Sequence, residues 1–494
     1  MSSFLVFVLV VNSGDPLANL RNDTSPERDT KIARRIAILH LDEPVPQRYL
    51  KWLRGVTGCV VPGRDCDLGT TVNDQSVTAL VSEALGATLR LVTAALVLAI
   101  VLGVAAGLVS ALRQYSGFDH TVSFTAFLFF SLPLFWVAVL LKQYLAIGAN
   151  NWFAEPRIGL ASALAVAAVT GGAAGALVGG DRRRRWLARV TAGGLTATIL
   201  VQLSREDWFR RPALGQAGIA VLSLGSALGI AYLSAGLGRR AVLVSCLATA
   251  TEGCLAQVVV TPWLQDPLWA SWTNVLLLLL VALLAAAVTG VALGAQDRGT
   301  AVRASMVTAA ATGAFILIDI LLRAVPGYAA LVNGRIIATI GSQTPEFAGG
   351  FWEQQLDILA HLLLPTLAVT LVTFASYSRY SRGTMLEAMS QDYVRTARSK
   401  GLPERVVVVR HALRNALIPL TTVAAMDVGA LLGGAVITEH VFGWRGMGTL
   451  FLGGLLQVDP NPVMGFFLVT VVAVIALNLV ADLAYALLDP RIRL

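Results

Sequence analysis

Apolar segments long enough to cross a bilayer alternate with short polar segments along most of the chain. An α-helix needs about 20 apolar residues to span the hydrocarbon core of a membrane. Five such segments lie at about residues 83–112, 120–146, 356–377, 417–436 and 464–488, and six more apolar segments lie between residues 158 and 323. The pattern therefore predicts an all-α protein that folds as a polytopic bundle of transmembrane helices.

The composition agrees with a membrane protein. Hydrophobic residues make up 56% of the 494 residues and charged residues 14%, with a mean hydropathy of +0.69, whereas a soluble globular protein usually has about a quarter of charged residues. The net charge of +8 falls largely in loops that we expect in the cytoplasm. It indicates topology and not nucleic-acid binding. No cleavable signal peptide is expected, because the apolar N-terminus lacks a basic flank and a cleavage site.

The first 82 residues are organised differently from the rest. Only eight apolar residues run from Phe4 to Val11, so residues 1–16 are expected to hold a partial first transmembrane helix, either truncated or read from a misplaced start. Residues 17–82 are polar and are expected to form an extracytoplasmic loop subdomain. Cys59 and Cys66 lie close together there, on the oxidising side of the membrane, so we expect a disulfide. Two reduced thiols are the alternative.

A charged segment, residues 382–415, separates two of the predicted spans. An excess of Lys and Arg in a short loop between spans places that loop in the cytoplasm. The basic residues are Arg382, Arg395, Arg398, Lys400, Arg405, Arg410 and Arg414, against the acidic residues Glu387, Asp392 and Glu404. We therefore expect this segment to face the cytoplasm.

Local signals within this segment predict two short helices with a break between them. Ser390 and Asp392 can cap a first helix that runs through Lys400, and Gly401 is the residue type that ends a helix in the left-handed conformation. Pro403 suits the first position of a second helix. We interpret the segment as a rigid knob that docks into a partner protein. A basic segment that contacts anionic lipid is the alternative.

The sequences DYVRTARSKGL (392–402) and RHALRNALIP (410–419) closely resemble the cytoplasmic coupling loop of permease subunits of ABC importers in the dipeptide/oligopeptide (peptide/nickel) branch. Such subunits are inner membrane components of binding-protein-dependent transport systems. The resemblance implies that the knob sits in a cleft of an ATP-binding subunit, where small Ala397 and Gly401 allow close approach. Relative to the general importer pattern, Pro419 comes several residues late. The residues implicated in coupling are Asp392, Tyr393, Arg395, Ala397, Arg398, Gly401, Arg410 and Asn415, although positive-inside anchoring is the alternative role for Arg395 and Arg398.

Other stretches share this resemblance. They are Gly14-Asp15-Pro16, LDEPVPQRYLKWL (41–53), SLPLFW (131–136), VITEHVFGWRGMGTL (436–450) and NLVADLAYALLDPRIR (478–493). Pro133 is expected to open backbone groups near the pathway, or simply to kink the helix. Arg445 replaces the usual proline of its motif, so that turn is expected to be less rigid. Arg491 and Arg493 indicate a cytoplasmic C-terminus.

The resemblance disappears between about residues 150 and 345. Six apolar segments lie there, at about 158–180, 187–203, 215–236, 241–261, 272–294 and 302–323. Their predicted inner turns hold nine arginines and their outer turns three, as the positive-inside rule requires. The expected organisation is a type I importer core with an inserted bundle of about six helices. The partial first helix is expected at 1–16, the extracytoplasmic loop subdomain at 17–82, core helices two and three at 83–149, the insertion at 150–345, and core helices four to six with the coupling loop at 346–494.

The resemblance implies a non-enzymatic permease subunit of the cell membrane that imports di- or oligopeptides by alternating access. Its expected partners are a second homologous permease subunit, one or two ATP-binding subunits, an extracytoplasmic substrate-binding protein, the peptide and membrane lipid. No cofactor is expected in the chain itself, with ATP and Mg in the partner subunits. The chain has no P-loop, because none of its lysines is followed by Ser or Thr. No catalytic or metal site is expected. Nickel chelates, glutathione or sugars are alternative substrates.

Isolated acids within the predicted spans support two rival hypotheses. Asp427 or Asp482 could serve an intramembrane enzyme, and Glu252 or Asp319 could couple an ion gradient to secondary transport, because burying a charge in a membrane is costly. We consider structural pairing the better explanation of Glu252 and Asp319.

Overall fold

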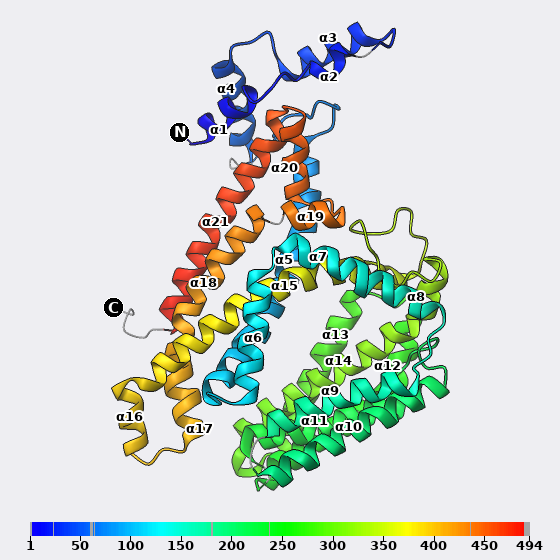
Figure 1. Cartoon of the computed structure of the whole chain (residues 1–494), viewed down its shortest axis with the longest axis vertical. Helices are drawn as coiled ribbons and strands as arrows, with labels where there is room; N and C mark the ends of the chain where they lie inside the picture. Colours follow the sequence, from blue (N-terminus) through cyan, green and yellow to red (C-terminus); the bar gives the residue numbers. More distant parts are fainter. Residues whose placement is uncertain are drawn as a thin grey trace. The chain divides into compact units, whose positions relative to one another are not determined.

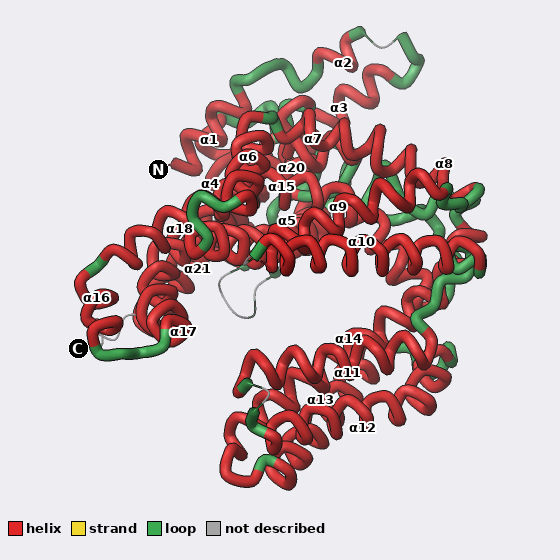
Figure 2. Tube along the Cα trace, turned by 60° about the horizontal axis from the view of Figure 1, so that its bottom comes forward, coloured by secondary structure: helices red, strands yellow, loops and turns green. Residues whose placement is uncertain are grey.

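The computed structural model describes residues 2–22, 24–59, 63, 65–178, 181–236, 238–434 and 436–488. The described residues are mainly helical and contain no strand beyond one isolated bridge between Thr70 and Ser76, as Figures 1 and 2 show. The elements are α1 (Ser2–Val11), α2 (Ala18–Arg21), α3 (Arg28–Leu39), α4 (Val45–Gly58), α5 (Val77–Leu112), α6 (Gly117–Ser131), α7 (Leu134–Leu140), the π-helix η1 (Leu141–Ile147), α8 (Gly148–Ala154), α9 (Leu160–Val178), α10 (Arg182–Arg205), α11 (Gly215–Ala235), α12 (Arg240–Gln265), α13 (Trp272–Leu293), the 3₁₀-helix η2 (Ala295–Asp297), α14 (Arg298–Leu331), α15 (Phe351–Ser390), α16 (Asp392–Ser399), α17 (Glu404–Val406), the π-helix η3 (Val407–Ala412), α18 (Leu413–Gly434), α19 (Val436–Phe442), α20 (Met447–Leu456) and α21 (Pro460–Leu488).

The chain forms two compact units. Unit 1 comprises Met1–Leu145, Thr339–Ser342 and Leu362–Leu494, and unit 2 comprises Ala146–Ala338 and Gln343–His361. Almost all of the segment from 150 to 345, where the resemblance disappears, therefore lies in unit 2.

Eight helices of the described residues are long and apolar enough to cross a membrane, namely α5, α10 to α15 and α21. A ninth span exists if the bent pair formed by α6 and the helical segment Leu134–Ala154 counts as one. The predicted all-α, multi-pass membrane architecture is confirmed. α18, which covers the predicted span at 417–436, is not among the eight.

The third predicted span, at 120–146, consists of two helical segments. α6 and the next helical segment meet at an angle of 104°. The cause is Pro133, which restricts the residue before it to extended backbone, and Leu132 accordingly has φ −88° and ψ 128°. Pro133 therefore does more than kink a helix, because it breaks the span in two.

α5 and α15 pack closely at Gly103 and Gly107, within unit 1. A Cβ atom on Gly103 would lie 2.6 Å from Cβ of Tyr377 on α15, and one on Gly107 would overlap Ser381. The Ser381 hydroxyl donates a hydrogen bond to the Gly103 carbonyl at 3.2 Å. The two glycines let α5 and α15 pack backbone to backbone.

Unit 2 contains all six predicted inserted helices, as α9 to α14. α9 pairs with α10, while α11, α12, α13 and α14 pack together as a four-helix bundle. Arg239, between α11 and α12, forms an ion pair with Asp297, before α14. Two of the three predicted basic turns therefore lie at the same end of the bundle. This agrees with the prediction that these turns lie on the same side of the membrane.

The two acids of unit 2 have different surroundings. Asp319 is fully buried and pairs with Arg323 at 2.8 Å, while the backbone N–H groups of Leu214 and Gly215 donate to it at 2.8 and 3.0 Å. Its charge is thus compensated, in keeping with a structural role. The Glu252 side chain lies on the outer surface of the bundle, on α12, and accepts a hydrogen bond from the Thr289 hydroxyl at 2.9 Å.

The N-terminal subdomain of unit 1 is attached to the start of α21. A disulfide joins Cys59 and Cys66 after α4. Farther along, the Val72 N–H donates to Asp459 at 2.8 Å, and the Asn461 side-chain amide donates to the Thr70 carbonyl at 2.8 Å. These bonds fix the loop before α5 against the loop before α21.

Candidate functional site: the loop between α15 and α18

Residues 391–403 connect two long helices of unit 1 and lie at the end of that unit opposite α1 to α4 (Figure 1). The loop is built around one short helix, α16. The start of this helix is capped by backbone hydrogen bonds alone. Gln391 is extended, and its carbonyl accepts hydrogen bonds from the N–H groups of Val394 at 3.1 Å and Arg395 at 3.3 Å. The predicted cap by Ser390 and Asp392 is wrong, because the Ser390 hydroxyl instead donates to the Glu387 carbonyl of its own helix at 2.8 Å.

The end of α16 has the predicted left-handed turn. Gly401 has φ +73°, and its N–H donates to the Arg398 carbonyl at 2.9 Å. Pro403 lies one position earlier than predicted, as the residue that precedes α17. The predicted second short helix is also corrected, because α17, η3 and α18 follow one another without a gap from Glu404 to Gly434. That stretch has no glycine or internal proline before Pro419 that could stop a helix.

An ion pair closes this turn. The Arg398 guanidinium donates to the two carboxylate oxygens of Glu404 at 2.7 and 3.2 Å. The same bonds hold the pKa of Glu404 below its usual value. Both side chains are largely exposed, so the pair contributes about 1 kcal/mol or less. Its main consequence is geometric, since it connects the end of α16 to the start of the next helix.

The apolar side of α16 is covered by the protein itself. Val394 is fully buried and Ala397 is 5% exposed. They belong to one cluster with residues from the ends of α5 and α15, from η3 and from the start of α18, namely Ala111, Met385, Ala388, Val407, Val408, Ala412 and Ala416. The interpretation of Ala397 as a small residue that lets a partner approach is therefore wrong, because its methyl group packs inward and holds α16 in place.

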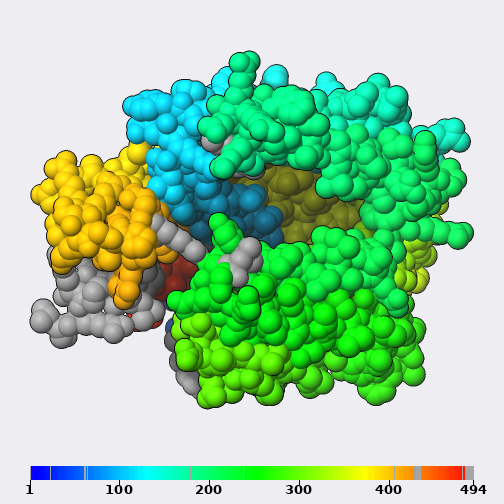
Figure 3. All heavy atoms as spheres, turned by 90° about the horizontal axis from the view of Figure 1, so that it is seen from below, coloured from blue at the N-terminus to red at the C-terminus, as the bar shows by residue number. Residues whose placement is uncertain are grey.

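The other side of α16 is exposed and charged. The exposed predicted coupling residues are Asp392, Tyr393, Arg395, Arg398, Gly401, Arg410 and Asn415. Arg395 lies 3.5 Å from Asp392, in a pair that is almost entirely in solvent. Figure 3, seen from below, shows the yellow to orange atoms of this segment on the surface. Most of the predicted coupling residues are therefore exposed, while Val394 and Ala397 pack inward.

An ion pair between Arg382 and Asp119, which the sequence did not reveal, holds the end of α15, just before the loop, against the start of α6. Asp119 at the start of α6 is 2% exposed and accepts two hydrogen bonds from Arg382 near the end of α15, at 2.8 and 3.0 Å. Ser110 and the Tyr115 N–H donate to the same carboxylate. The only sequence signal was an acid in the short turn between two spans. In the sequence, Arg382 is one of several basic residues of the segment 382–415, with nothing nearby that marks Asp119 as its partner.

A second bonded turn lies between α19 and α20. Glu439 is fully buried; it accepts hydrogen bonds from the Thr88 hydroxyl at 2.7 Å and the Thr449 N–H at 2.9 Å. Trp444 donates from its indole N–H to the Ala87 carbonyl at 3.2 Å. These bonds connect the turn that contains Arg445 to α5.

Fold and loop together define a multi-pass helical membrane protein with a charged loop, built around α16, between two long helices. A family model described as "binding-protein-dependent transport system inner membrane component" matches residues 99–494. The chain belongs to this family.

The curated relatives with similar sequences are permeases. The oligopeptide transport system permease protein OppB of Mycobacterium tuberculosis is 43% identical over 153 residues, which is 31% of this chain and 47% of the relative. The dipeptide transport system permease protein DppB of Escherichia coli K12 is 41% identical over 138 residues, 28% of this chain and 41% of the relative. AppB of Bacillus subtilis, also an oligopeptide permease, is 40% identical over 136 residues, 28% of this chain and 43% of the relative. The chain spans less than half the length of each of these relatives.

Proposed function

We propose that this chain is the permease subunit of an ATP-dependent importer of di- or oligopeptides, and that it forms the translocation pathway with a second, homologous permease. ATP hydrolysis takes place in separate ATP-binding subunits, and an external binding protein delivers the substrate. The observation that carries the proposal is the two-sided construction of α16, which is held inward by Val394 and Ala397 and exposes charge outward.

This construction suits the transmission of movement. A loop that moves independently of the spans could bind a partner but could not push on them. Here the buried side of α16 packs on the ends of three helices that lead into the membrane region of unit 1. A displacement of the exposed side therefore has to move α5, α15 and η3 with it, because close-packed interiors deform little.

Alternating access follows from this coupling in thermodynamic terms. ATP and substrate shift the permease between inward- and outward-open states only by as much as they bind one state more tightly than the other. We place the loop and the C-terminus in the cytoplasm, on the charge argument for residues 382–415. Arg491 and Arg493, which also support this orientation, lie outside the described residues.

Peptides are the proposed substrate because the names of the relatives specify dipeptide and oligopeptide transport. Nickel chelates, glutathione and sugars are the alternatives within the same architecture. The ligand retained by the purified binding protein decides among them.

Uptake into membrane vesicles tests the proposal. Peptide uptake should require ATP and the ATP-binding subunits, and it should persist when the proton gradient is dissipated. Uptake that continues without those subunits but stops with the proton gradient overturns the proposal in favour of secondary transport.

A matched pair of variants tests the role of α16. Arg395→Ala removes an exposed charge and should weaken co-purification of the ATP-binding subunits without lowering the thermal stability of the chain. Arg303→Ala removes a charge on α14 of unit 2, which is not part of the loop, and should leave co-purification unchanged. Equal retention of the ATP-binding subunits by both variants would contradict the assignment.

A further inference from the structure

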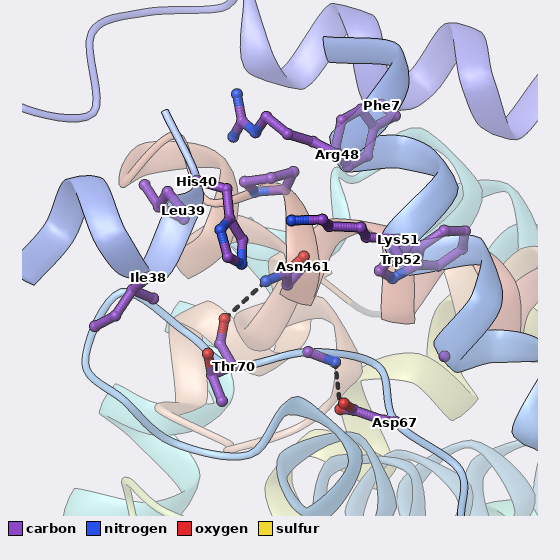
Figure 4. A pocket seen from close by; sticks show the side chains of 13 residues that line it. Phe7, Ile38, Leu39, His40, Arg48, Lys51, Trp52, Asp67, Thr70 and Asn461 are labelled. Carbon is purple, nitrogen blue, oxygen red and sulfur yellow. Dashed lines mark hydrogen bonds between the residues drawn. The ribbon is translucent and has the colours of Figure 1, made fainter. Parts of the chain in front are cut away.

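The N-terminal subdomain contains a cavity that the proposed transport mechanism does not use. Its volume is about 250 Å³. Its walls come from α1, α4, the end of α3 and the loop before α5, and Pro460 and Asn461 contribute from the start of α21. Figure 4 shows the side chains of Arg48 and Lys51 extending from α4 in the direction of His40. The cavity is therefore polar on the α4 side.

Arg48 is the unusual residue of this cavity. It is 8% exposed, and within the described part of the chain no acidic side chain lies within ion-pair distance of its guanidinium. The closest charge partner in electrostatic terms is Glu43, whose carboxylate is already paired with Lys51. A buried cation without a partner costs free energy, because the protein replaces none of the water it has lost.

Trp52 adds a second unsatisfied donor. Its side chain lines the cavity, and its indole N–H is buried with no hydrogen-bond acceptor among the described residues. Buried polar groups are usually hydrogen-bonded. The indole N–H has almost no accessible surface, so Trp52 contributes its ring to the cavity wall, and Arg48 and Lys51 are the charged donors on this helix that line the cavity.

We propose that this cavity binds the carboxylate group of a small organic molecule, with the Arg48 guanidinium as its principal partner and Lys51 beside it. A guanidinium matches a carboxylate with two parallel N–H donors. This site goes beyond the proposed function, since carboxylate binding requires neither ATP nor the partner subunits.

The surrounding charges favour a single negative charge over a doubly charged ligand such as phosphate. Asp67 lines the cavity opposite the cations and accepts the Gly69 N–H at 2.8 Å. Glu43 offsets Lys51. Arg48 and Lys51 thus carry two positive charges against the two negative charges of Glu43 and Asp67, so a dianion meets more repulsion there than a monoanion does. The volume is below the ~300–1,000 Å³ of pockets for drug-sized ligands, so the ligand is small.

Ligand-observed NMR on the purified full-length chain in detergent tests the proposal with N-acetylglycine, glycinamide and inorganic phosphate as probes. N-acetylglycine should bind saturably and raise the unfolding temperature. Glycinamide, which lacks a carboxylate, should not bind. Absence of saturable N-acetylglycine binding, or phosphate binding as tight as that of N-acetylglycine, overturns the assignment.

Variants of α4 locate the binding. Arg48→Gln should weaken N-acetylglycine binding about 10- to 100-fold, because a hydrogen bond to a charged group contributes about 1.5–3 kcal/mol. Lys51→Gln, at a half-exposed position that tolerates substitution, should weaken binding several-fold and serves if Arg48→Gln fails to fold. Arg54→Gln removes the same charge from the same helix outside the cavity and should bind as the wild type does. The proposal is overturned if both variants bind N-acetylglycine with the affinity of the wild type. It is also overturned if Arg48→Gln misfolds and Lys51→Gln binds with the affinity of the wild type.

Discussion

A substitution at Gly401 should show the effect of backbone strain in the loop without any effect of altered side-chain packing. Its φ of +73° lies in the left-handed region, where an L-residue costs about 1–2 kcal/mol. A Cβ atom at Gly401 would meet no atom within 4 Å, so Gly401→Ala adds backbone strain and no steric clash. Gly383 on α15 is also free of neighbours for a Cβ but is helical, and Gly383→Ala should stabilise by about 0.5–1 kcal/mol.

The predicted effect can be measured by hydrogen exchange on the purified chain. A loss of about 1–2 kcal/mol should speed exchange of the α16 amides about 5- to 30-fold in Gly401→Ala. Gly383→Ala should leave exchange in α16 unchanged or slower. If α16 exchanges equally fast in the wild type and in Gly401→Ala, the left-handed turn does not hold the helix in place and the reasoning fails.

Gly401→Pro should have a stronger effect on function. Proline cannot adopt a positive φ, and it removes the N–H that donates to the Arg398 carbonyl at 2.9 Å. We expect the variant to insert into membranes normally and to hydrolyse ATP in the assembled complex while peptide uptake falls. Uptake at the wild-type level would refute the coupling role of this turn.

Three further predictions concern stability, each measured as a free energy of unfolding. Arg382→Gln leaves the buried Asp119 carboxylate unpaired and should cost about 3–5 kcal/mol, whereas the double variant with Asp119→Asn should recover part of the loss. Burial raises the pKa of Asp459 to about 6, so the native state binds more protons than the unfolded state between about pH 4 and 6. The free energy of unfolding should therefore fall by about 3 kcal/mol as the pH rises through that window. Asp459→Asn should abolish this pH dependence. Replacing both Cys59 and Cys66 by Ser should cost about 2–3 kcal/mol, from the chain entropy of a short loop.

Each of these has a control and a contradicting result. Arg395→Gln removes an exposed arginine and should change the free energy of unfolding by less than about 1 kcal/mol. If Arg382→Gln changes it by no more than this control does, the buried Asp119 carboxylate does not depend on Arg382. The pH test compares the wild type with Asp459→Asn, and identical slopes would contradict the raised pKa. For the disulfide, unchanged stability of the reduced wild type would contradict the expected cost.

The sequence alone determined the features that depend on neighbouring residues or on the membrane as a solvent. The hydrophobic segments specified membrane-spanning helices, because a helix satisfies its own backbone hydrogen bonds in lipid. The left-handed end of α16 was predictable at Gly401, since a turn of this kind depends on one residue and its immediate neighbours.

Only the tertiary structure decided which side of each element is covered. α16 is eight residues long, too short for its sequence to show whether Ala397 faces a partner or the protein itself. The partners Asp119 and Arg382 are 263 positions apart, and Thr88 and Glu439 are 351 apart. The cavity around Arg48 combines α4 with the start of α21. Contacts at such separations depend on how complete helices pack against one another, and no local pattern in the sequence records that packing.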